Sequence, residues 1–330
     1  MKAYIHHKVT GIPGTTYTDM EEREPGQGEV KIKLFSAGLN HRDLFVLQRH
    51  KETDPPLIIG SDGAGIIEAV GPGVQGVSVG DEVVINPSLG WKENSDAPPD
   101  GHEILGLPDH GTLAEKITIS IDNIGPKPPH LTWDEAGVLS LAALTAYRAL
   151  FTRAKVKPTD TILLPGIGGG AVTFLLLFAK AIGARVIVTS RSRLKRERAL
   201  QLGADMAIDS NGNWDEALQG EKVDVVIETV GAATFDKSLQ QLRKGGTMVT
   251  FGASAGDEVN FNLRNFFYGQ YTLIGSTLGS GEEFQQMLTF VNEHNIKPVI
   301  DKVFPLQEVD KALTRIEEAE QFGKIAIKIN

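Results

Sequence analysis

The sequence predicts an α/β protein of two domains, one built on a doubly wound parallel sheet and the other on a tightly turned, barrel-like set of strands. Its 330 residues are enough for about two domains with substantial cores. Up to about Asn123 the chain reads as short strands separated by glycine-rich turns, whereas from about Gly125 short apolar strands alternate with helical segments. That alternation is typical of a parallel sheet covered by helices on both faces.

The composition narrows the classes of function. A net charge of −9 argues against a general nucleic-acid binder. No apolar run reaches the roughly 20 residues that cross a bilayer, and the N-terminus has no signal-peptide core. The absence of cysteine excludes disulfides and thiolate metal sites. We therefore expect a cytoplasmic protein with a small-molecule substrate and neither a nucleic-acid nor a membrane partner.

The first part of the chain carries the strand signals. Glu29–Leu34 alternates polar and apolar residues with period two, which predicts a half-buried strand. Further short strands are expected at Ile66–Val70 and Glu82–Ile85, between closely spaced glycines. Residues 90–112 are polar and rich in turn formers, so we expect a surface excursion there.

The second part begins with a helix start signal. Thr132 and Glu135 have the spacing of a capping box, so a helix is expected to run from there toward Leu150. Further strands are expected at 161–164, 185–189, 206–208, 223–227, 247–251 and 271–275, and further helices at 171–182, 193–202, 213–219 and 234–243. Toward the C-terminus, helices are expected at 282–294 and 306–319, and a closing strand at 324–329.

A glycine-rich turn stands between an expected strand and an expected helix, the context that a dinucleotide-binding motif requires. The first glycine permits a tight turn, the second lets the backbone approach a pyrophosphate, and a small residue at the end allows strand and helix to pack closely. The phosphate would then meet free backbone N–H groups at the start of the helix. We expect the dinucleotide to be bound by Gly166, Gly168, Gly169, Gly170 and Ala171.

The residues after the next strand favour NADPH over NADH. A site that prefers NADH usually has Asp or Glu there, to bind the ribose 2′-hydroxyl. Residues 189–195 (TSRSRLK) contain no acid, and their hydroxyl and cationic groups would suit a 2′-phosphate. We expect Ser190, Arg191 and Lys195 to make these contacts. Residues at the carboxyl ends of later strands are expected to line the same crevice, namely Val230, Phe251 and Gly252.

Together these features resemble the medium-chain dehydrogenase/reductase superfamily. The resemblance rests on VGPGV at 70–74 and VGDEV at 79–83, in register with the glycine turn. It implies a GroES-like β-barrel catalytic domain at 1–125 and 278–330, and a Rossmann-type nucleotide-binding domain at 126–277. It also implies that Thr145 lies near the nicotinamide, and that a homodimer or tetramer forms through the last strand of the nucleotide-binding domain, near Tyr271–Ser276.

The chain departs from the zinc alcohol dehydrogenases of that superfamily at the metal site. Aligned residue by residue, Asn40 stands at the position of the first cysteine ligand, Ser61 at that of the histidine and Leu141 at that of the later cysteine. An amide, a hydroxyl and an isobutyl group do not form a zinc site. Residues 90–112 also lack the four cysteines of the structural-zinc lobe. The chain thus resembles the zinc-free quinone oxidoreductase and enoyl reductase-like branch.

Without a metal, the hydride acceptor must already be electron-poor. A quinone, an enone or an enal qualifies, because its carbonyl oxygen takes up the negative charge and needs only a hydrogen-bond donor. We expect Asn40 and Thr145 to be catalytic, with Asn40 contacting the substrate or the nicotinamide ribose, and Asp62 to have a structural hydrogen-bonding role. Some zinc-free relatives have a tyrosine where this chain has Phe45, so His41 and water both stay candidates for the proton donor.

The resulting prediction is an NADPH-dependent, zinc-independent reductase of quinones or α,β-unsaturated carbonyls. Two alternatives stay open. One is an alcohol dehydrogenase that binds a metal through atypical ligands, which elemental analysis would reveal. The other is an NADPH-binding structural or regulatory protein without turnover, which NADPH oxidation with a panel of acceptors would exclude.

Overall fold

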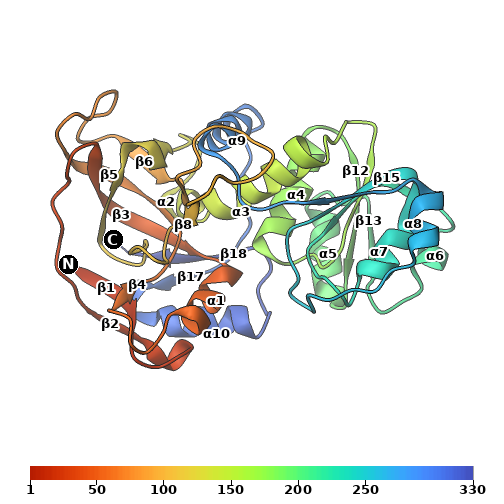
Figure 1. Ribbon diagram of the computed structural model, residues 1–330, viewed down its shortest axis with the longest axis horizontal. Coiled ribbons are helices and arrows are strands. Elements are labelled where there is room, and N and C mark those ends of the chain that lie inside the picture. Colours follow the sequence, from red (N-terminus) through yellow and green to blue (C-terminus); the bar gives the residue numbers. More distant parts are fainter. Residues whose placement is uncertain (330) are drawn as a thin grey trace. The chain divides into compact units, whose positions relative to one another are not determined.

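The computed structural model describes residues 1–329 and divides the chain into two compact units (Figure 1). The first unit comprises Met1–Leu144 together with the chain from Gly279 onward, and the second comprises Thr145–Leu278. The first is built mainly on antiparallel strands, and the second on a wholly parallel sheet with helices. The predicted α/β class is therefore confirmed.

The main sheet of the first unit has seven strands in the order β10-β6-β5-β3-β18-β17, with β9 also paired to β3. A three-stranded sheet, β2-β1-β4, and the pair β7 and β8 complete the unit. The strands are β1 (Lys2–His6), β2 (Thr15–Asp19), β3 (Glu29–Leu39), β4 (Leu57–Ile58), β5 (Asp62–Val70), β6 (Glu82–Ile85), β7 (Ser88–Leu89), β8 (Glu103–Ile104), β9 (Lys116–Ser120), β10 (Ile124–Pro126), β17 (Ile300–Pro305) and β18 (Lys324–Lys328).

Strand β3 is the centre of this sheet and is longer than the sequence predicts. Its alternating side chains Val30, Ile32 and Leu34 have no exposed surface, as the period-two pattern requires. The strand continues to Leu39, because its second half is covered on one side by β5 and on the other by β18.

The pairing of β3 with its two neighbours positions three polar residues. β18 runs antiparallel to β3 with Ile325 opposite Leu39, and β5 runs antiparallel to it with Asp62 opposite Gly38. Lys324 starts β18, Asp62 starts β5, and Asn40 follows directly on the end of β3. Segments far apart in the sequence thus meet at one end of the sheet.

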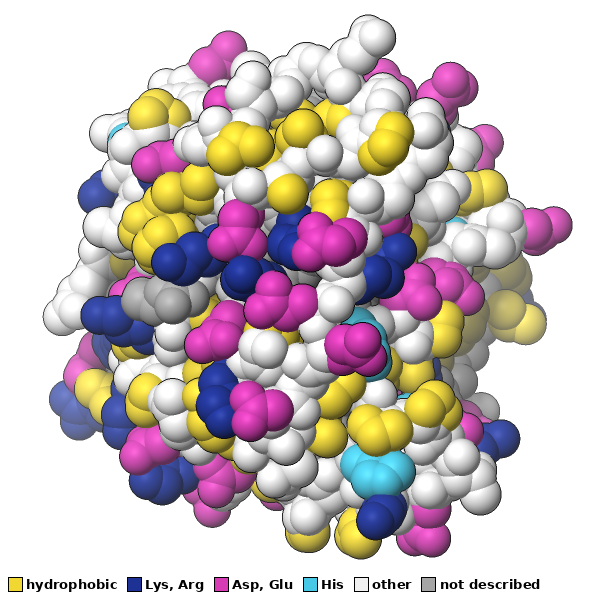
Figure 2. Space-filling view, turned by 90° about the vertical axis from the view of Figure 1, so that its left-hand side faces the viewer, with side chains coloured by type: hydrophobic (Ala, Val, Ile, Leu, Met, Phe, Trp, Pro, Cys, Tyr) yellow, Lys and Arg dark blue, Asp and Glu magenta, His cyan; other side chains and the backbone are white. Residues whose placement is uncertain are grey.

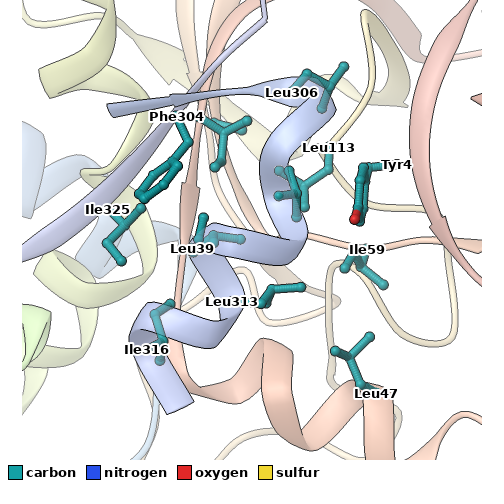
Figure 3. Packing of buried hydrophobic residues seen from close by; sticks show 14 of the residues in the cluster. Tyr4, Leu39, Leu47, Ile59, Leu113, Phe304, Leu306, Leu313, Ile316 and Ile325 are labelled. Carbon is teal, nitrogen blue, oxygen red and sulfur yellow. The ribbon is translucent and has the colours of Figure 1, made fainter. Parts of the chain in front are cut away.

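Two helices cover this end of the first unit, α1 (His41–Arg49) and α10 (Val309–Glu317). Figure 3 shows Leu313 of α10 among apolar side chains that include Leu39 of β3 and Leu47 of α1. These side chains are at most 2% exposed. The shared core therefore fixes where α1 begins, and with it the position of Asn40.

The second unit is a doubly wound parallel sheet in the order β13-β12-β11-β14-β15-β16. Its strands are β11 (Thr161–Leu164), β12 (Arg185–Ser190), β13 (Met206–Asp209), β14 (Val223–Glu228), β15 (Leu242–Thr250) and β16 (Thr272–Gly275). Its helices are α4 (Gly170–Ala181), α5 (Arg193–Gln201), α6 (Trp214–Ala217), α7 (Phe235–Gln241) and α8 (Leu263–Gly269). Every strand and helix expected between 161 and 275 is present, with boundaries that differ by a few residues, and α8 is additional.

The helix expected from Thr132 toward Leu150 is wrong as a single element. The Thr132 capping box is present, but the chain forms α2 (Trp133–Gly137), α3 (Ser140–Tyr147) and a π-helical turn at Arg148–Arg153. At Gly137 the backbone lies so close to β3 that a Cβ atom would approach Ser36 to 2.7 Å. Close packing of α2 on the sheet therefore sets the break, which helix propensity does not reveal.

The surface of the first unit mixes charges of both signs. Figure 2 shows basic and acidic side chains interspersed on the face that it presents, and ion pairs such as Lys2–Asp19, Arg23–Glu29 and Lys116–Glu68 belong to this unit. Among residues 1–329, no helix is long and apolar enough to span a bilayer.

Candidate active site

The glycine turn of the second unit has the backbone that a phosphate loop requires. Gly166 and Gly168 have φ angles of 75° and 135°, in the region that favours glycine. The N–H of Ile167, between them, donates to the carbonyl oxygen of Thr189 at 2.8 Å, which ties the turn to β12. Helix α4 then starts at Gly170, and Gly169 at its N-cap supplies no side-chain cap. The first N–H groups of α4 are therefore available to an anion.

Two side chains lie against this turn. A Cβ atom at Gly166 would lie 2.5 Å from Cγ2 of Val230, and one at Gly168 would lie 2.9 Å from Cδ of Lys195. At Gly169 a Cβ would meet nothing within 4 Å. The structure thus brings the predicted residues Val230 and Lys195 to the glycine turn, with the Lys195 ammonium beside Gly168.

The end of β12 carries the residues expected to select the cofactor. Ser190 is 6% exposed, and its hydroxyl oxygen accepts from the N–H of Ser192 at 3.2 Å. The side chain of Arg191 is exposed. Arg196, which the sequence analysis did not select, donates to the carbonyl oxygen of Ser190 at 2.6 Å and pairs with Asp209 at 3.1 Å. Asp209, which lies opposite Ser190 on the neighbouring strand β13, is thus already paired with a cation.

The loop after β14 is held by the carboxylate of Glu228, for which the sequence predicts no role. Glu228 is fully buried and accepts hydrogen bonds from the N–H groups of Val230 and Gly231 and from the Thr234 hydroxyl. The N–H of Phe251 donates to the carbonyl oxygen of Glu228 at 3.4 Å. A Cβ at Gly252 would lie 2.8 Å from the carbonyl oxygen of Thr229. Glu228 therefore shapes the two loops that carry Val230, Phe251 and Gly252.

The first unit contains a compact polar cluster of Asn40, Asp62 and Lys324. The Lys324 ammonium lies 2.5 Å from Oδ1 of Asn40 and 2.9 Å from Oδ2 of Asp62. Nδ2 of Asn40 donates to the same Asp62 oxygen at 2.9 Å, and the N–H of Leu141 donates to the other at 2.7 Å. All three side chains are buried, with residue exposures of 7%, 0% and 3% respectively. We name this group the Lys–Asp–Asn cluster.

Lys324 is the member of this cluster that sequence reasoning missed. It stands in the apolar alternation of the closing strand, where a charge is expected to point to solvent. The alternation of β18 places Lys324 on the same face as Ala326 and Lys328, and this shared face is the only local signal for Lys324. Its partners lie 284 and 262 residues away, so no local pattern identifies them.

The residues at the expected zinc position do not fit a metal ion. The Ser61 hydroxyl donates to the carbonyl oxygen of Leu105 at 2.7 Å and accepts from the Arg42 guanidinium at 2.6 Å. Oδ1 of Asn40 faces an ammonium group, and Leu141 offers no ligand atom. The oxygens of Asn40 and Ser61 are thus already engaged by cationic donors, and residues 1–329 contain no group of three or more His, Cys, Asp or Glu that could hold a metal.

Helix α1 carries further polar groups beside the cluster. Asp43 is fully buried, and its Oδ2 accepts from the N–H of Asn40 at 2.7 Å. Burial raises the pKa of the Asp43 carboxyl to about 6. The ring of His41 lies edge-on to that of Phe45, which is 48% exposed, and desolvation lowers the pKa of the His41 imidazole. Thr145 lies in the second unit, on α3, and is 8% exposed.

Each unit of the chain matches a known domain family. Residues 26–129 match the family model of the alcohol dehydrogenase GroES-like domain, and residues 166–293 match that of the zinc-binding dehydrogenase. The chain is 32% identical to the zinc-type alcohol dehydrogenase-like protein YogA of Leptosphaeria maculans, over 92% of each chain. The chain belongs to the medium-chain dehydrogenase/reductase superfamily.

Other members of this superfamily differ in what their names say they act on. The chain is 30% identical to crotonyl-CoA reductase of Streptomyces collinus, over 92% of this chain and 79% of that one. A solved structure of an NAD-dependent alcohol dehydrogenase is 33% identical over the whole of both chains, with a TM-score of 0.93. The predicted superfamily and its pairing of a GroES-like domain with a Rossmann-type sheet are confirmed. The superfamily consists of NAD(P)-dependent oxidoreductases, so the protein is assigned oxidoreductase activity.

Proposed function

We propose that the protein is a zinc-independent, NADPH-dependent reductase of α,β-unsaturated carbonyls or quinones. The observation that carries the proposal is the Lys–Asp–Asn cluster together with the Arg42–Ser61 contact at the expected metal position. Such a site has hydrogen-bond donors and internal charge balance but no set of metal ligands. The likeness to crotonyl-CoA reductase supports an enoyl thioester as one acceptor.

The chain's own residues have limited tasks in this reaction. When bound, the reduced nicotinamide supplies a hydride. The glycine turn and α4 would bind the cofactor pyrophosphate, and Asn40 would donate a hydrogen bond to the acceptor's carbonyl oxygen as charge develops there. His41 is the proton donor that we favour over water, because it directly follows Asn40 and is solvent-exposed at the start of α1.

The preference for NADPH follows from the charges at the end of β12. Ser190, Arg191 and Lys195 offer a hydroxyl and two cations, and Asp209 is engaged by Arg196. We expect Arg191→Ala to lower kcat/KM for NADPH by about 10-fold or more, since hydrogen bonds to charged groups contribute about 1.5–3 kcal/mol. Activity with NADH should change little. Arg193→Ala is the matched control, because Arg193 pairs with Glu197 on the exposed side of α5. Equal kcat/KM for NADH and NADPH in the wild type would refute the preference.

One experiment addresses the reaction itself. Purified protein, with its zinc content measured, is assayed for NADPH oxidation with crotonyl-CoA, a simple enal, benzoquinone and a saturated ketone, each with and without chelator. The proposal expects substoichiometric zinc, chelator-resistant turnover of the enal, the thioester or the quinone, and none of the ketone. Stoichiometric zinc with chelator-sensitive alcohol oxidation would instead support the alcohol dehydrogenase reading, which the likeness to the zinc-type protein favours. No turnover with any acceptor would support a binding role.

The expected homodimer or tetramer has support in the second unit. β16 is one of the two edge strands of the parallel sheet, so one side of it is unpaired within the sheet. Leu273 on β16 is 40% exposed, and α8 exposes Leu263 by 69% and Tyr268 by 66%. An open edge beside exposed apolar side chains suits a second copy of the same chain.

A further inference from the structure

Lys324 has no task in the reaction as set out so far, yet its ammonium is almost completely buried. A buried charge is costly unless it is paired and hydrogen-bonded. Asp62 balances it at 2.9 Å, so the pair carries no net charge. The remaining partner, at 2.5 Å, is the amide oxygen of Asn40, the residue expected to contact the substrate.

The two charged groups leave the Asn40 carboxamide with a single allowed orientation. An ammonium can only donate hydrogen bonds and a carboxylate can only accept them. The amide oxygen must therefore face Lys324 and the amide nitrogen must face Asp62, as the structure has them. A flipped amide would set N–H against N–H on one side and oxygen against oxygen on the other. The usual ambiguity between the two ends of an asparagine is thus resolved by electrostatics.

This orientation determines what Asn40 can offer to a ligand. One N–H of its Nδ2 is used by Asp62, and within residues 1–329 the structure gives Nδ2 no second partner. The amide oxygen is occupied by Lys324. Asn40 is 7% exposed, so it retains some access. Toward a ligand, Nδ2 can therefore donate its remaining N–H and so stabilise a negative oxygen, whereas the amide oxygen already accepts from Lys324.

We propose that Lys324 is a positioning residue that, with Asp62, holds the Asn40 amide so that one N–H is directed at the acceptor's carbonyl oxygen. The inference rests on the proposed reduction at Asn40. Because the Lys324–Asp62 pair is neutral overall, its effect is orientation rather than a replacement for the field of a metal ion. A fixed donor costs no reorganisation as charge develops on the oxygen, which is the basis of its catalytic value.

The first test is a double-mutant cycle with Lys324→Met and Asn40→Ala. Lys324→Met removes the ammonium from a side chain of similar length, so the amide loses its fixed orientation. We expect kcat for an enal to fall about 10- to 100-fold, less than the full loss of an oxyanion donor, with the Kd for NADPH unchanged. On the Asn40→Ala background the same change should have no further effect, because the group that it positions is gone.

The matched control is Lys31→Met. Lys31 is also a buried lysine of the first unit, 6% exposed and paired with Glu24, but it has no contact with Asn40. It should leave kcat within about twofold of wild type, since it lies outside the cluster. Equal losses from Lys324→Met on both backgrounds would overturn the positioning role and leave Lys324 as a structural residue.

A second variant keeps the proposal falsifiable if Lys324→Met does not fold. Asn40→Leu keeps nearly the shape of asparagine and removes the N–H donor without setting a second carboxylate against Asp62. It should keep a cooperative thermal transition and lose enal reduction as Asn40→Ala does, and wild-type activity in this variant would overturn the inference. If the wild type itself reduces no enal or quinone, the proposed function fails. Turnover by the wild type with an additive cycle rejects the positioning role alone.

Discussion

At the scale of single residues, the Asp43 carboxyl beside the candidate site has a strongly raised pKa. Its carboxylate is fully buried, one oxygen accepts from the N–H of Asn40, and the other has no partner among residues 1–329. Burial raises its pKa to about 6 from the ordinary 3.8, in spite of the positive charge of Arg42. The protein therefore holds a carboxylate at neutral pH in a place that favours the neutral acid.

This pKa shift predicts how stability depends on pH. A folded-state pKa above the unfolded one means that the contribution of Asp43 is fully present below about pH 4 and is lost as pH rises through about 6. Asp43→Asn should remove this component, so the stability of the variant relative to wild type should increase by about 2–3 kcal/mol between pH 4 and 7, at 1.36 kcal/mol per unit. Urea unfolding at several pH values measures it. A difference between the two proteins that is independent of pH would contradict the raised pKa.

At the scale of elements, the packing of α10 against α1 supports the position of Asn40. Leu313 has no exposed surface and lies in the cluster that also holds Leu39 and Leu47 (Figure 3). Apart from His41 at the start of α1, no residue of these two helices is assigned a contact with the substrate in the proposed reaction. Their shared core nevertheless fixes the start of α1. A loss of packing there would shift the Asn40 amide that precedes this helix.

Leu313→Ala tests this support. It should lower the free energy of unfolding by about 2–5 kcal/mol, the cost of a buried leucine replaced by alanine. It should also lower kcat for the preferred acceptor more than it changes the Kd for NADPH, because the cofactor-binding residues lie in the second unit. Lys311→Ala on the exposed side of α10 is the control, since its ion pair with Glu308 is at the surface and contributes little. An unfolding free energy within 0.5 kcal/mol of wild type for Leu313→Ala would contradict the packing argument.

At the scale of the whole molecule, the largest sheet of each unit ends in an edge strand that carries one similarly exposed apolar side chain. β16 closes one side of the parallel sheet and β17 one side of the antiparallel sheet. Leu273 on β16 and Val303 on β17 are both 40% exposed. Of these two strands, β16 is the one preceded directly in the chain by α8, whose Leu263 and Tyr268 are further exposed apolar side chains, so we take this edge as the candidate subunit interface.

We predict that Leu273→Lys weakens self-association and that Val303→Lys does not. A lysine placed on a paired edge introduces a charge that the interface must bury or repel. Sedimentation velocity across a range of protein concentrations gives the mass of each variant. A wild type that is monomeric, or an unchanged mass for Leu273→Lys, would exclude β16 as the interface.

The sequence determined the parts of this protein that depend on local signals. The period-two pattern of β3, the strand–helix alternation of the second unit and the glycine turn between β11 and α4 are all present where the residues predict them. The absence of cysteine and the identity of Asn40 and Ser61 were likewise enough to question a zinc site. Each of these signals lies within a few residues, because backbone preference and side-chain alternation act at that range.

Only the tertiary structure decided which distant groups meet. Helix propensity gave no sign of the break between α2 and α3, because close packing of Gly137 on β3 sets it. The basic segment after β12 did not show that Lys195 lies beside Gly168. The contact of Lys324 with Asn40 depends on the register of β18 against β3, which is set by burying apolar side chains across 284 residues of chain. Neither segment alone contains a sequence pattern that identifies its long-range partner. The donor at Asn40 could therefore be predicted from the sequence, but the lysine proposed to orient it could not.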